Sequence, residues 1–189
     1  TTGRLPAADV EIDDVLVRAL LQAQHPDLAA LPLTGGGSGW DNQIYRLGTD
    51  LAVRLPRRRV SAPLVLHEQR WLPLLAAQLP VPVPVPVRIG RPGCGYPWAW
   101  SIAPWFRGRD ATASRFDAHP MALALGGFIR ALHRPAPDDA PRNTFRGVPL
   151  RDRSDAVHER LVQVEHLIDA NALLARWSGA VEAQPWNGP

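Results

Sequence analysis

The chain has 189 residues, of which 46% are hydrophobic and 21% are charged, and its formal net charge is +3 at pH 7. Such a length corresponds to about one domain or one and a half, and such a composition builds a core and argues against disorder. All 21 basic residues are arginine, which excludes the Gly-Lys-Ser/Thr loop of P-loop NTPases. Because the charge is modest and the arginines are scattered, the sequence gives no support for nucleic-acid binding.

Features that would direct the chain to a membrane or to an oxidising compartment are missing from the sequence. No apolar run reaches the roughly 18 residues that a membrane-spanning helix needs. The first residues, TTGRLPAADVEIDD, do not show the charged-then-apolar pattern of a signal peptide. The single cysteine, Cys94, cannot form an internal disulfide. A chain without these features is expected in the reducing cytoplasm.

The first part of the chain predicts one helix and a hairpin. Residues 10–23 are expected to form an amphipathic helix that ends at His25-Pro26. Its predicted apolar face consists of Ile12, Val15, Leu16, Ala19 and Leu20. Strands are predicted at 43–47 and 51–55, with a tight turn between them. The glycine-rich stretch GGGSG at 35–39 is expected to lie at the entry to the first strand or in the loop before it.

The middle of the chain predicts a helix, a connector and two further strands. The helix covers 63–78, where Pro63 suits its first turn and Pro73 is expected to kink or divide it. Alternating proline in LPVPVPVPV, residues 79–87, predicts an extended connector or a sheet edge. The two strands are predicted at 85–89 and 96–104.

After residue 107 the pattern is helical, with helices predicted at 120–133, 154–168 and 170–183. The chain is therefore expected to have an α+β fold. Residues 1–106 would form a lobe with an antiparallel sheet and a helix, and residues 107–189 a partial helical lobe.

Four features, each weak alone, follow one another in an informative order. They are a glycine-rich stretch before a hairpin, the triplet Ala52-Val53-Arg54 on its second strand, Glu68 on the next helix, and the strand WSIAPWFRG. Together they are typical of the small lobe of protein-kinase-like phosphotransferases.

The chemistry of these residues supports that interpretation. Bare backbone at residues 36–39 can lie over phosphates and present N–H donors. Ala52 and Arg54 share one face of a strand, so Ala52 leaves room for a flat base while Arg54 reaches the phosphates. Glu68 is the only carboxylate of its predicted helix and is expected to hold Arg54 in a charge-assisted pair.

The segment Pro104-Trp105-Phe106 is expected to recognise a base through its backbone. Alternate residues of an extended segment aim their backbone groups at the same edge. The carbonyl of Pro104 would accept from the exocyclic amine of adenine, and the N–H of Phe106 would donate to a ring nitrogen.

The sequence resembles the aminoglycoside phosphotransferase family, small-molecule kinases with a protein-kinase-like fold. The resemblance lies in GWDNQIYRLGTDLAVRLPRR (39–58), HEQRWLPLLAAQLPVPVPVPV (67–87), YPWAWSIAPWFRG (96–108), LGGFIRALH (125–133) and RNTFRGVPLRDR (142–153). It implies ATP or GTP with Mg²⁺ as cofactors, and a hydroxyl of an aminoglycoside, a macrolide or a metabolite as acceptor. It also implies a phosphate-covering loop at 35–42.

The resemblance gives Arg54 the role of the strand lysine that grips the phosphates, with Glu68 as its partner. An arginine cannot lose its proton, so it suits gripping rather than proton transfer. The residues expected around the nucleotide are Gly36, Gly37, Ser38, Gly39, Asn42, Ala52, Arg54, Glu68, Pro104 and Phe106.

The sequence departs from the family at the catalytic stretch. Family members carry His-Gly-Asp-x-x-x-x-x-Asn and a later magnesium-binding aspartate, and neither occurs in these 189 residues. The segment HLIDAN at 166–171 has the wrong spacing, and Asp169 is expected to cap a helix. No catalytic or metal-binding residue is therefore assigned, and the magnesium ligands are expected beyond residue 189.

The 189 residues are accordingly expected to be the front portion of an enzyme. Because the positioned base and the magnesium ligands are missing, we expect them to transfer no phosphate at a useful rate on their own. Apolar surface left bare on the partial helical lobe is expected to favour self-association.

Two other functions stay open at this point. The first is a non-catalytic nucleotide-binding or interaction module with a kinase-like lobe. The second is a dinucleotide-binding enzyme, which is disfavoured because the glycine pattern after Gly37 lacks its third glycine and a hairpin rather than a helix follows.

Several single residues also carry open alternatives. Tryptophans 98, 100 and 105 either pack in a core or stack on a base or substrate. Asp110 and Asp117 either face an entrance for a cationic substrate or are loop and cap residues. The run of arginines at 57–59 is expected to be a solvated turn.

Overall fold

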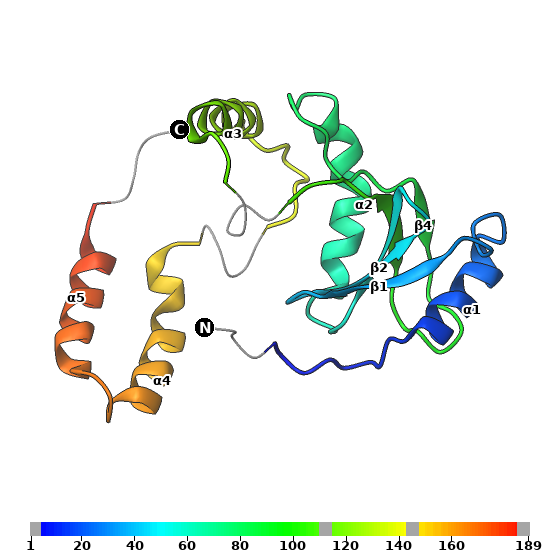
Figure 1. The fold of residues 1–189 in the computed structure, drawn as a ribbon. Helices are drawn as coiled ribbons and strands as arrows, with labels where there is room; N and C mark the ends of the chain where they lie inside the picture. The colour runs from blue at the N-terminus through cyan, green and yellow to red at the C-terminus, as the bar shows by residue number, and fades with distance from the viewer. Residues whose placement is uncertain (1–4, 110–114, 143–147, 185–189) are drawn as a thin grey trace. The chain divides into compact units, whose positions relative to one another are not determined.

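The computed structural model describes residues 5–109, 115–142 and 148–184. The chain forms two compact units, Thr1–Ala136 and Pro137–Pro189 (Figure 1). The first unit contains the sheet, and the second contains helices. The sequence boundary predicted between residues 106 and 107, where the sheet ends, stays a prediction.

The sheet has five antiparallel strands in the order β1-β2-β3-β5-β4. Their bounds are β1 Leu33–Ser38, β2 Asn42–Leu47, β3 Leu51–Pro56, β4 Arg88–Gly90 and β5 Trp100–Pro104. The predicted hairpin is confirmed as β2 and β3, and Gly48 takes a positive φ of 62° in the turn between them. Only glycine adopts such a φ at no steric cost.

The glycine-rich stretch is itself a strand, which the sequence did not predict. β1 pairs with β2 from Leu33↔Leu47 to Ser38↔Gln43, with a bulge between Gly35 and Gly37. Gly37 has a φ of 111° there. The glycines therefore form the first strand of a β1–β2 hairpin, rather than a loop before it. Glycine supplies no side-chain alternation, so the usual strand signal was missing.

One face of the sheet packs against α1 Asp14–Gln24 to form the core (Figure 1). The carboxylate of Asp13 accepts a hydrogen bond from the Leu16 N–H at 2.8 Å, which starts the helix later than predicted. The buried face consists of Val17, Leu20 and Leu21, whereas Val15 is 70% exposed. The predicted face was therefore partly wrong, because apolar residues surround most of this helix.

Trp100 is the largest fully buried side chain of the core. Its indole N–H donates to the Arg91 carbonyl at 3.1 Å. A Cβ at Gly90 would lie 1.9 Å from the Trp100 ring, so only glycine fits on this neighbouring strand. Trp98 packs against the same core and meets Tyr96 edge to face at a ring-centroid distance of 5.7 Å. For these two tryptophans, core packing is the correct alternative.

The opposite face of the sheet carries α2, Ala62–Ala76 (Figure 1). Proline lies in its first turn, as predicted, and Pro73 does not divide the helix. The side-chain amide of Gln69 donates to the Trp100 carbonyl at 2.9 Å and to the Ser101 hydroxyl at 3.0 Å. These bonds attach α2 to β5.

The proline repeat that follows α2 has neither helix nor strand, which confirms a connector. β4 starts three residues later than predicted, although the Val87 N–H already donates to the Ile102 carbonyl at 2.8 Å. β5 starts at Trp100 because Tyr96 instead exchanges backbone hydrogen bonds with Gly93 in the turn.

The helices that follow the sheet in the chain belong partly to the first unit and partly to the second. α3 Ala118–Leu132 is capped by Asp117, whose carboxylate accepts from the His119 N–H at 3.0 Å. Asp117 is therefore a cap, whereas Asp110 lies outside the described residues. The second unit contains η1 Leu150–Arg153, α4 Ser154–Val164 and α5 Ala170–Glu182.

Asp169 caps α5 as predicted, because its carboxylate accepts from the Ala172 N–H at 2.9 Å. The indole of Trp177 on α5 donates to the hydroxyl of Ser154 on α4 at 3.1 Å. Within the described ranges, none of the helices is long and apolar enough to cross a membrane.

Two tyrosines should make the stability of this chain depend on alkaline pH. Burial raises the pKa of Tyr96 well above its usual range, and the Tyr96 hydroxyl donates to the Pro56 carbonyl at 2.9 Å. Burial, and secondarily the negative charges of Asp14 and Asp13, also raise the pKa of Tyr45. The raised values keep both hydroxyls protonated in the folded chain after the unfolded chain has released its protons.

We expect the contribution of the tyrosines to the free energy of unfolding to be constant below about pH 9 and to fall above it, at up to about 1.4 kcal/mol per pH unit for each tyrosine. The chain contains no lysine, so the tyrosines dominate the proton balance there. Urea unfolding between about pH 9 and pH 11 measures the slope. Tyr96→Phe should remove one tyrosine's share of the slope, and an unchanged slope in this variant would contradict the account.

Candidate functional site

Arg54 and Glu68 form a bidentate ion pair on the α2 side of the sheet. Val53 and Leu55 point into the core, so strand alternation directs Arg54 to the opposite face. Its Nη2 lies 3.1 Å from Glu68 Oε1, and its Nη1 lies 3.1 Å from Glu68 Oε2. The side chains are 20% and 29% exposed, respectively. The predicted ion pair is confirmed.

This geometry fixes the plane of the guanidinium. Two parallel contacts to one carboxylate restrict both the position and the rotation of an arginine head. The remaining N–H donors are directed away from Glu68 and are suited to a second anionic group. Directly across from Arg54 lie Ile44 on β2 and Ser101 on β5, which add no charge of their own.

The predicted glycine residues lie in the β1–β2 hairpin. A Cβ at Gly35 or Gly37 would meet no atom within 4 Å, so open space surrounds this strand. β1 is an edge strand, so part of its backbone N–H groups face away from the sheet. The Ser38 hydroxyl, however, donates to the side-chain oxygen of Gln43.

The last residues of the predicted loop close the hairpin tip. The Gly39 N–H donates to the Asn42 carbonyl at 2.8 Å, so this N–H is not free for a phosphate as the sequence suggested. The side-chain oxygen of Asn42 is buried and has no hydrogen-bond partner among the described residues. Asn42 thus keeps an acceptor at the base of the tip.

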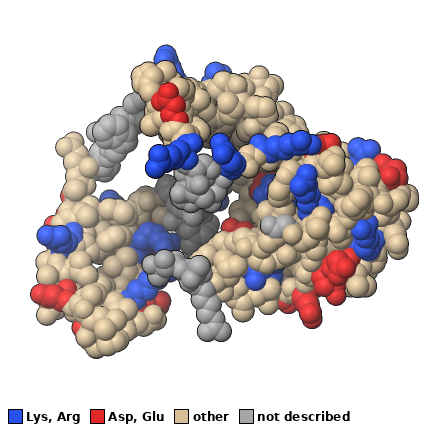
Figure 2. Space-filling model, in the orientation of Figure 1, with Lys and Arg blue, Asp and Glu red and all other residues tan. Residues whose placement is uncertain are grey.

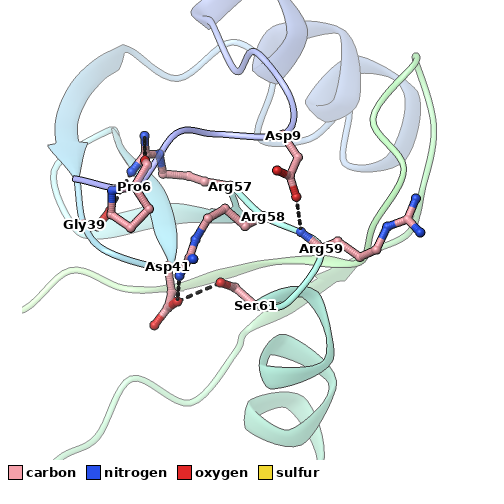
Figure 3. Close-up of polar contacts among 8 residues, drawn as sticks. All are labelled: Pro6, Asp9, Gly39, Asp41, Arg57, Arg58, Arg59 and Ser61. Carbon is pink, nitrogen blue, oxygen red and sulfur yellow. Dashed lines mark hydrogen bonds and ion pairs between the residues drawn. The ribbon is translucent and has the colours of Figure 1, made fainter. Parts of the chain in front are cut away.

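The hairpin tip is bound to residues 57–61, a contact that sequence reasoning missed (Figure 3). The Asp41 carboxylate accepts from Arg58 Nη2 at 3.0 Å and from the Ser61 hydroxyl at 2.7 Å. Arg57 Nη1 donates to the Gly39 carbonyl at 2.9 Å. The expected solvated turn was therefore wrong for Arg57 and Arg58. The signal was the hairpin register, which places Asp41 beside these arginines.

Backbone groups at the end of β5 face the sheet edge that was predicted to recognise a base. The Trp105 N–H donates to the Asp50 carbonyl at 2.8 Å and so continues the β3–β5 ladder. Strand alternation then turns the Pro104 carbonyl and the Phe106 N–H toward the β4 side, beyond the end of β4. Ala52 and Ala103 are buried opposite each other on these strands, and their small side chains project little from the sheet.

Trp105 contacts a cation rather than the core. The Arg46 guanidinium carbon lies 5.7 Å from the centroid of the Trp105 ring. Arg46 also donates to the Thr49 carbonyl at 3.0 Å. These contacts fix the turn between β2 and β3 close to the predicted base edge.

Other parts of the described chain do not add to this site. No group of three or more His, Cys, Asp or Glu residues in the described ranges is arranged to hold a metal ion. A surface depression of about 480 Å³ lies elsewhere and is lined by Gln24, His25, Ile89, Arg91 and Pro92. It contains none of the predicted site residues. Figure 2 shows arginine and acidic side chains interspersed over the visible face of the first unit.

Comparison with known proteins places this arrangement in context. The sequence pattern of the phosphotransferase enzyme family matches residues 32–188. None of the curated proteins matches the chain in sequence.

Solved structures match the fold at low sequence identity. The GDP complex of wild-type aminoglycoside 2'-phosphotransferase-IIIa has a TM-score of 0.72 and 23% identity, and the match covers 89% of this chain and 59% of that one. Macrolide 2'-phosphotransferase MphH from Brachybacterium faecium, as the apoenzyme, has a TM-score of 0.55 and 22% identity, with coverage of 93% and 63%. The streptomycin–ATP ternary complex of APH(2")-IIa has a TM-score of 0.56 and 16% identity, with coverage of 84% and 53%.

The chain thus spans between 53% and 63% of the length of these proteins. At such identities the likeness shows the fold alone. It confirms the predicted α+β, kinase-like fold with an antiparallel sheet and helices.

The bidentate geometry predicts a measurable coupling between Arg54 and Glu68. A double-mutant cycle with Arg54→Met and Glu68→Gln should give a coupling energy of about 1 kcal/mol in the free energy of unfolding, decreasing with added salt. The matched control is the pair Arg88–Asp27, which has one 3.5 Å contact and side chains 48% and 57% exposed. That pair should couple by less than about 0.5 kcal/mol. Equal coupling in the two pairs would argue against a preorganised guanidinium.

Proposed function

Because the chain belongs to the phosphotransferase enzyme family, we propose that its first unit binds ATP or GTP for phosphoryl transfer to a small-molecule hydroxyl. The observation that carries this proposal is the bidentate Arg54–Glu68 pair on the α2 side of the sheet. The nucleotide complexes of structural neighbours, which include GDP and ATP, support the same ligand class.

Arg54 is proposed to hold the phosphates through the donors that Glu68 leaves available. Because Glu68 already fixes the guanidinium, little side-chain freedom is lost when the anion arrives. The charge of Arg54 persists at every working pH, so it grips and orients the phosphates and takes no part in proton transfer. Phosphoryl transfer depends mainly on such positioning and on electrostatic stabilisation.

The base is proposed to lie against Ala52, at the edge formed by Pro104 and Phe106. A carbonyl acceptor and an N–H donor two residues apart match the donor and acceptor atoms on the edge of adenine. The glycine residues of β1 would cover the phosphates, since they carry no side chains that would block a close approach. Gly36, Gly37 and Ser38 are the proposed covering residues, with Gly39 and Asn42 shaping the tip.

Magnesium would accompany the nucleotide and neutralise the charge of its phosphates. The described residues do not form a magnesium site, so its ligands are not assigned here. The catalytic His-Gly-Asp stretch is also missing from the 189 residues. We therefore propose that this chain alone binds nucleotide without transferring phosphate at a useful rate.

The proposed acceptor is a hydroxyl of an aminoglycoside or a macrolide. Among the structural neighbours, one structure contains GDP and kanamycin, another contains streptomycin and ATP, and a third is a macrolide phosphotransferase. Such an activity would confer antibiotic resistance in the cytoplasm, where we place the protein.

Self-association is a further part of the proposal, and an alternative function stays open beside it. α3 has no buried residue, and its Leu123 is 65% exposed, which supports self-association through apolar surface. A non-catalytic nucleotide-binding module is the second candidate function. Phosphate transfer by any protein that contains these 189 residues would exclude it.

Titration with a non-hydrolysable ATP or GTP analogue tests the nucleotide site. Arg54→Met should weaken binding by about 30- to 100-fold, because a charge-assisted contact to the phosphates is lost. Arg54→Lys should retain part of the affinity, since an ammonium keeps the charge but not the fork. Arg88→Met, which removes an exposed arginine paired to Asp27, should leave affinity unchanged. Unchanged affinity in Arg54→Met would remove Arg54 from its proposed role.

A further inference from the structure

Asp41 lies where three parts of the first unit meet. It belongs to the tip of the β1–β2 hairpin, between Gly39 and Asn42 (Figure 3). Its backbone carbonyl accepts from the Arg57 N–H at 2.8 Å, directly after β3. The same side-chain oxygen, Oδ1, accepts from Arg58 Nη2 at 3.0 Å and from the Ser61 hydroxyl at 2.7 Å. One carboxylate thereby connects the hairpin, the end of β3 and the start of α2.

Ser61 shows that the link to α2 replaces an ordinary local interaction. A serine at the N-cap of a helix usually accepts a hydrogen bond from a backbone N–H of the first turn. Ser61 is the N-cap of α2 and makes no such side-chain bond. Its hydroxyl is buried and donates to Asp41 instead. The Ser61 hydroxyl therefore attaches the start of α2 to the hairpin tip instead of capping the helix.

Arg58 depends on Asp41 for its charged partner. Its side chain is 19% exposed, and its Nε is buried with no hydrogen-bond acceptor among the described residues. Arg57 adds a second tie, because its Nη1 donates to the Gly39 carbonyl at 2.9 Å. The Arg57 carbonyl also accepts from the Asp9 N–H at 2.9 Å, and the Asp9 carboxylate accepts from the Arg59 N–H at 2.8 Å. The N-terminal arm thus braces the segment that holds the tip.

A glycine strand needs such an external attachment. The glycines of β1 have no side chains to pack, and open space surrounds Gly35 and Gly37. Contacts at the ends of β1 must therefore hold this strand in position over a ligand. At the other side of the link, α2 carries Glu68 about two turns beyond Ser61. Displacing the start of α2 would therefore displace the carboxylate that orients Arg54.

We infer that Asp41 is a positioning residue that locks the glycine hairpin to α2, so that the strand covering the phosphates and the Arg54–Glu68 pair keep a fixed relation. The link to phosphate binding rests on the proposed function. The mechanical coupling of hairpin and helix does not.

Hydrogen exchange on the nucleotide-free 189-residue chain tests the coupling. Asp41→Ala, which removes the oxygen that accepts both bonds, should raise exchange at the hairpin tip and in the first turn of α2 together, each by about tenfold. Asp27→Ala, which removes the 3.5 Å pair with Arg88, is the matched control and should change neither segment. Faster exchange at the tip alone, or at neither segment, would overturn the inference.

Ser61→Ala is a milder variant that decides the case if Asp41→Ala fails to fold. Because Ser61 makes no capping bond, this change removes only the link to Asp41. Exchange in both segments should again rise, and unchanged exchange in both would overturn the inference.

Measurements of nucleotide affinity then distinguish a positioning role of Asp41 from a general loss of stability. Asp41→Ala should weaken the binding of a non-hydrolysable triphosphate analogue by about tenfold, and the binding of the corresponding nucleoside monophosphate by less than about twofold. A purely structural role would weaken both ligands equally, and equal losses would overturn the phosphate part of the inference. If the unmodified chain bound neither ligand, the proposed function would fail, while the exchange result would still decide the coupling.

Discussion

The proposed nucleotide site depends on the orientation of one guanidinium, that of Arg54. Arg54 can meet Glu68, 14 residues later, only if β3 turns Arg54 away from the core and α2 crosses that face of the sheet. Val53 and Leu55 satisfy the first condition because they are buried with α1 on the opposite face. Burial of those apolar side chains supplies far more free energy than the ion pair, so the core sets the geometry that the pair uses.

α2 meets the second condition because it is attached at two places. Gln69, next to Glu68, bonds to the backbone and side chain of β5, while Ser61 bonds to Asp41 at the hairpin tip. A helix held at its start and near its middle cannot rotate its carboxylate freely. The same attachment also holds β1 in place, although the glycines of β1 contribute almost no packing contacts of their own.

Local patterns predicted the parts of the fold that local forces determine. The β2–β3 hairpin follows from alternation and a glycine turn, the Asp169 cap from helix-end chemistry, and the Arg54–Glu68 pair from strand period and complementary charge. β1 could not be predicted, because glycine leaves no alternation to read. The contacts of Arg58 were missed although the register of the β2–β3 hairpin places Asp41, 17 residues earlier, beside the residues that follow β3. The roles of the site residues toward a nucleotide remain predictions.

A crystal structure of the chain with a non-hydrolysable ATP or GTP analogue would show whether Arg54 holds the phosphates. We expect phosphate oxygens within hydrogen-bond distance of the Arg54 guanidinium, the Glu68 contacts still in place, and the base at the Pro104–Phe106 edge. A nucleotide bound elsewhere, or an Arg54 side chain that leaves Glu68 to reach the phosphates, would contradict this expectation.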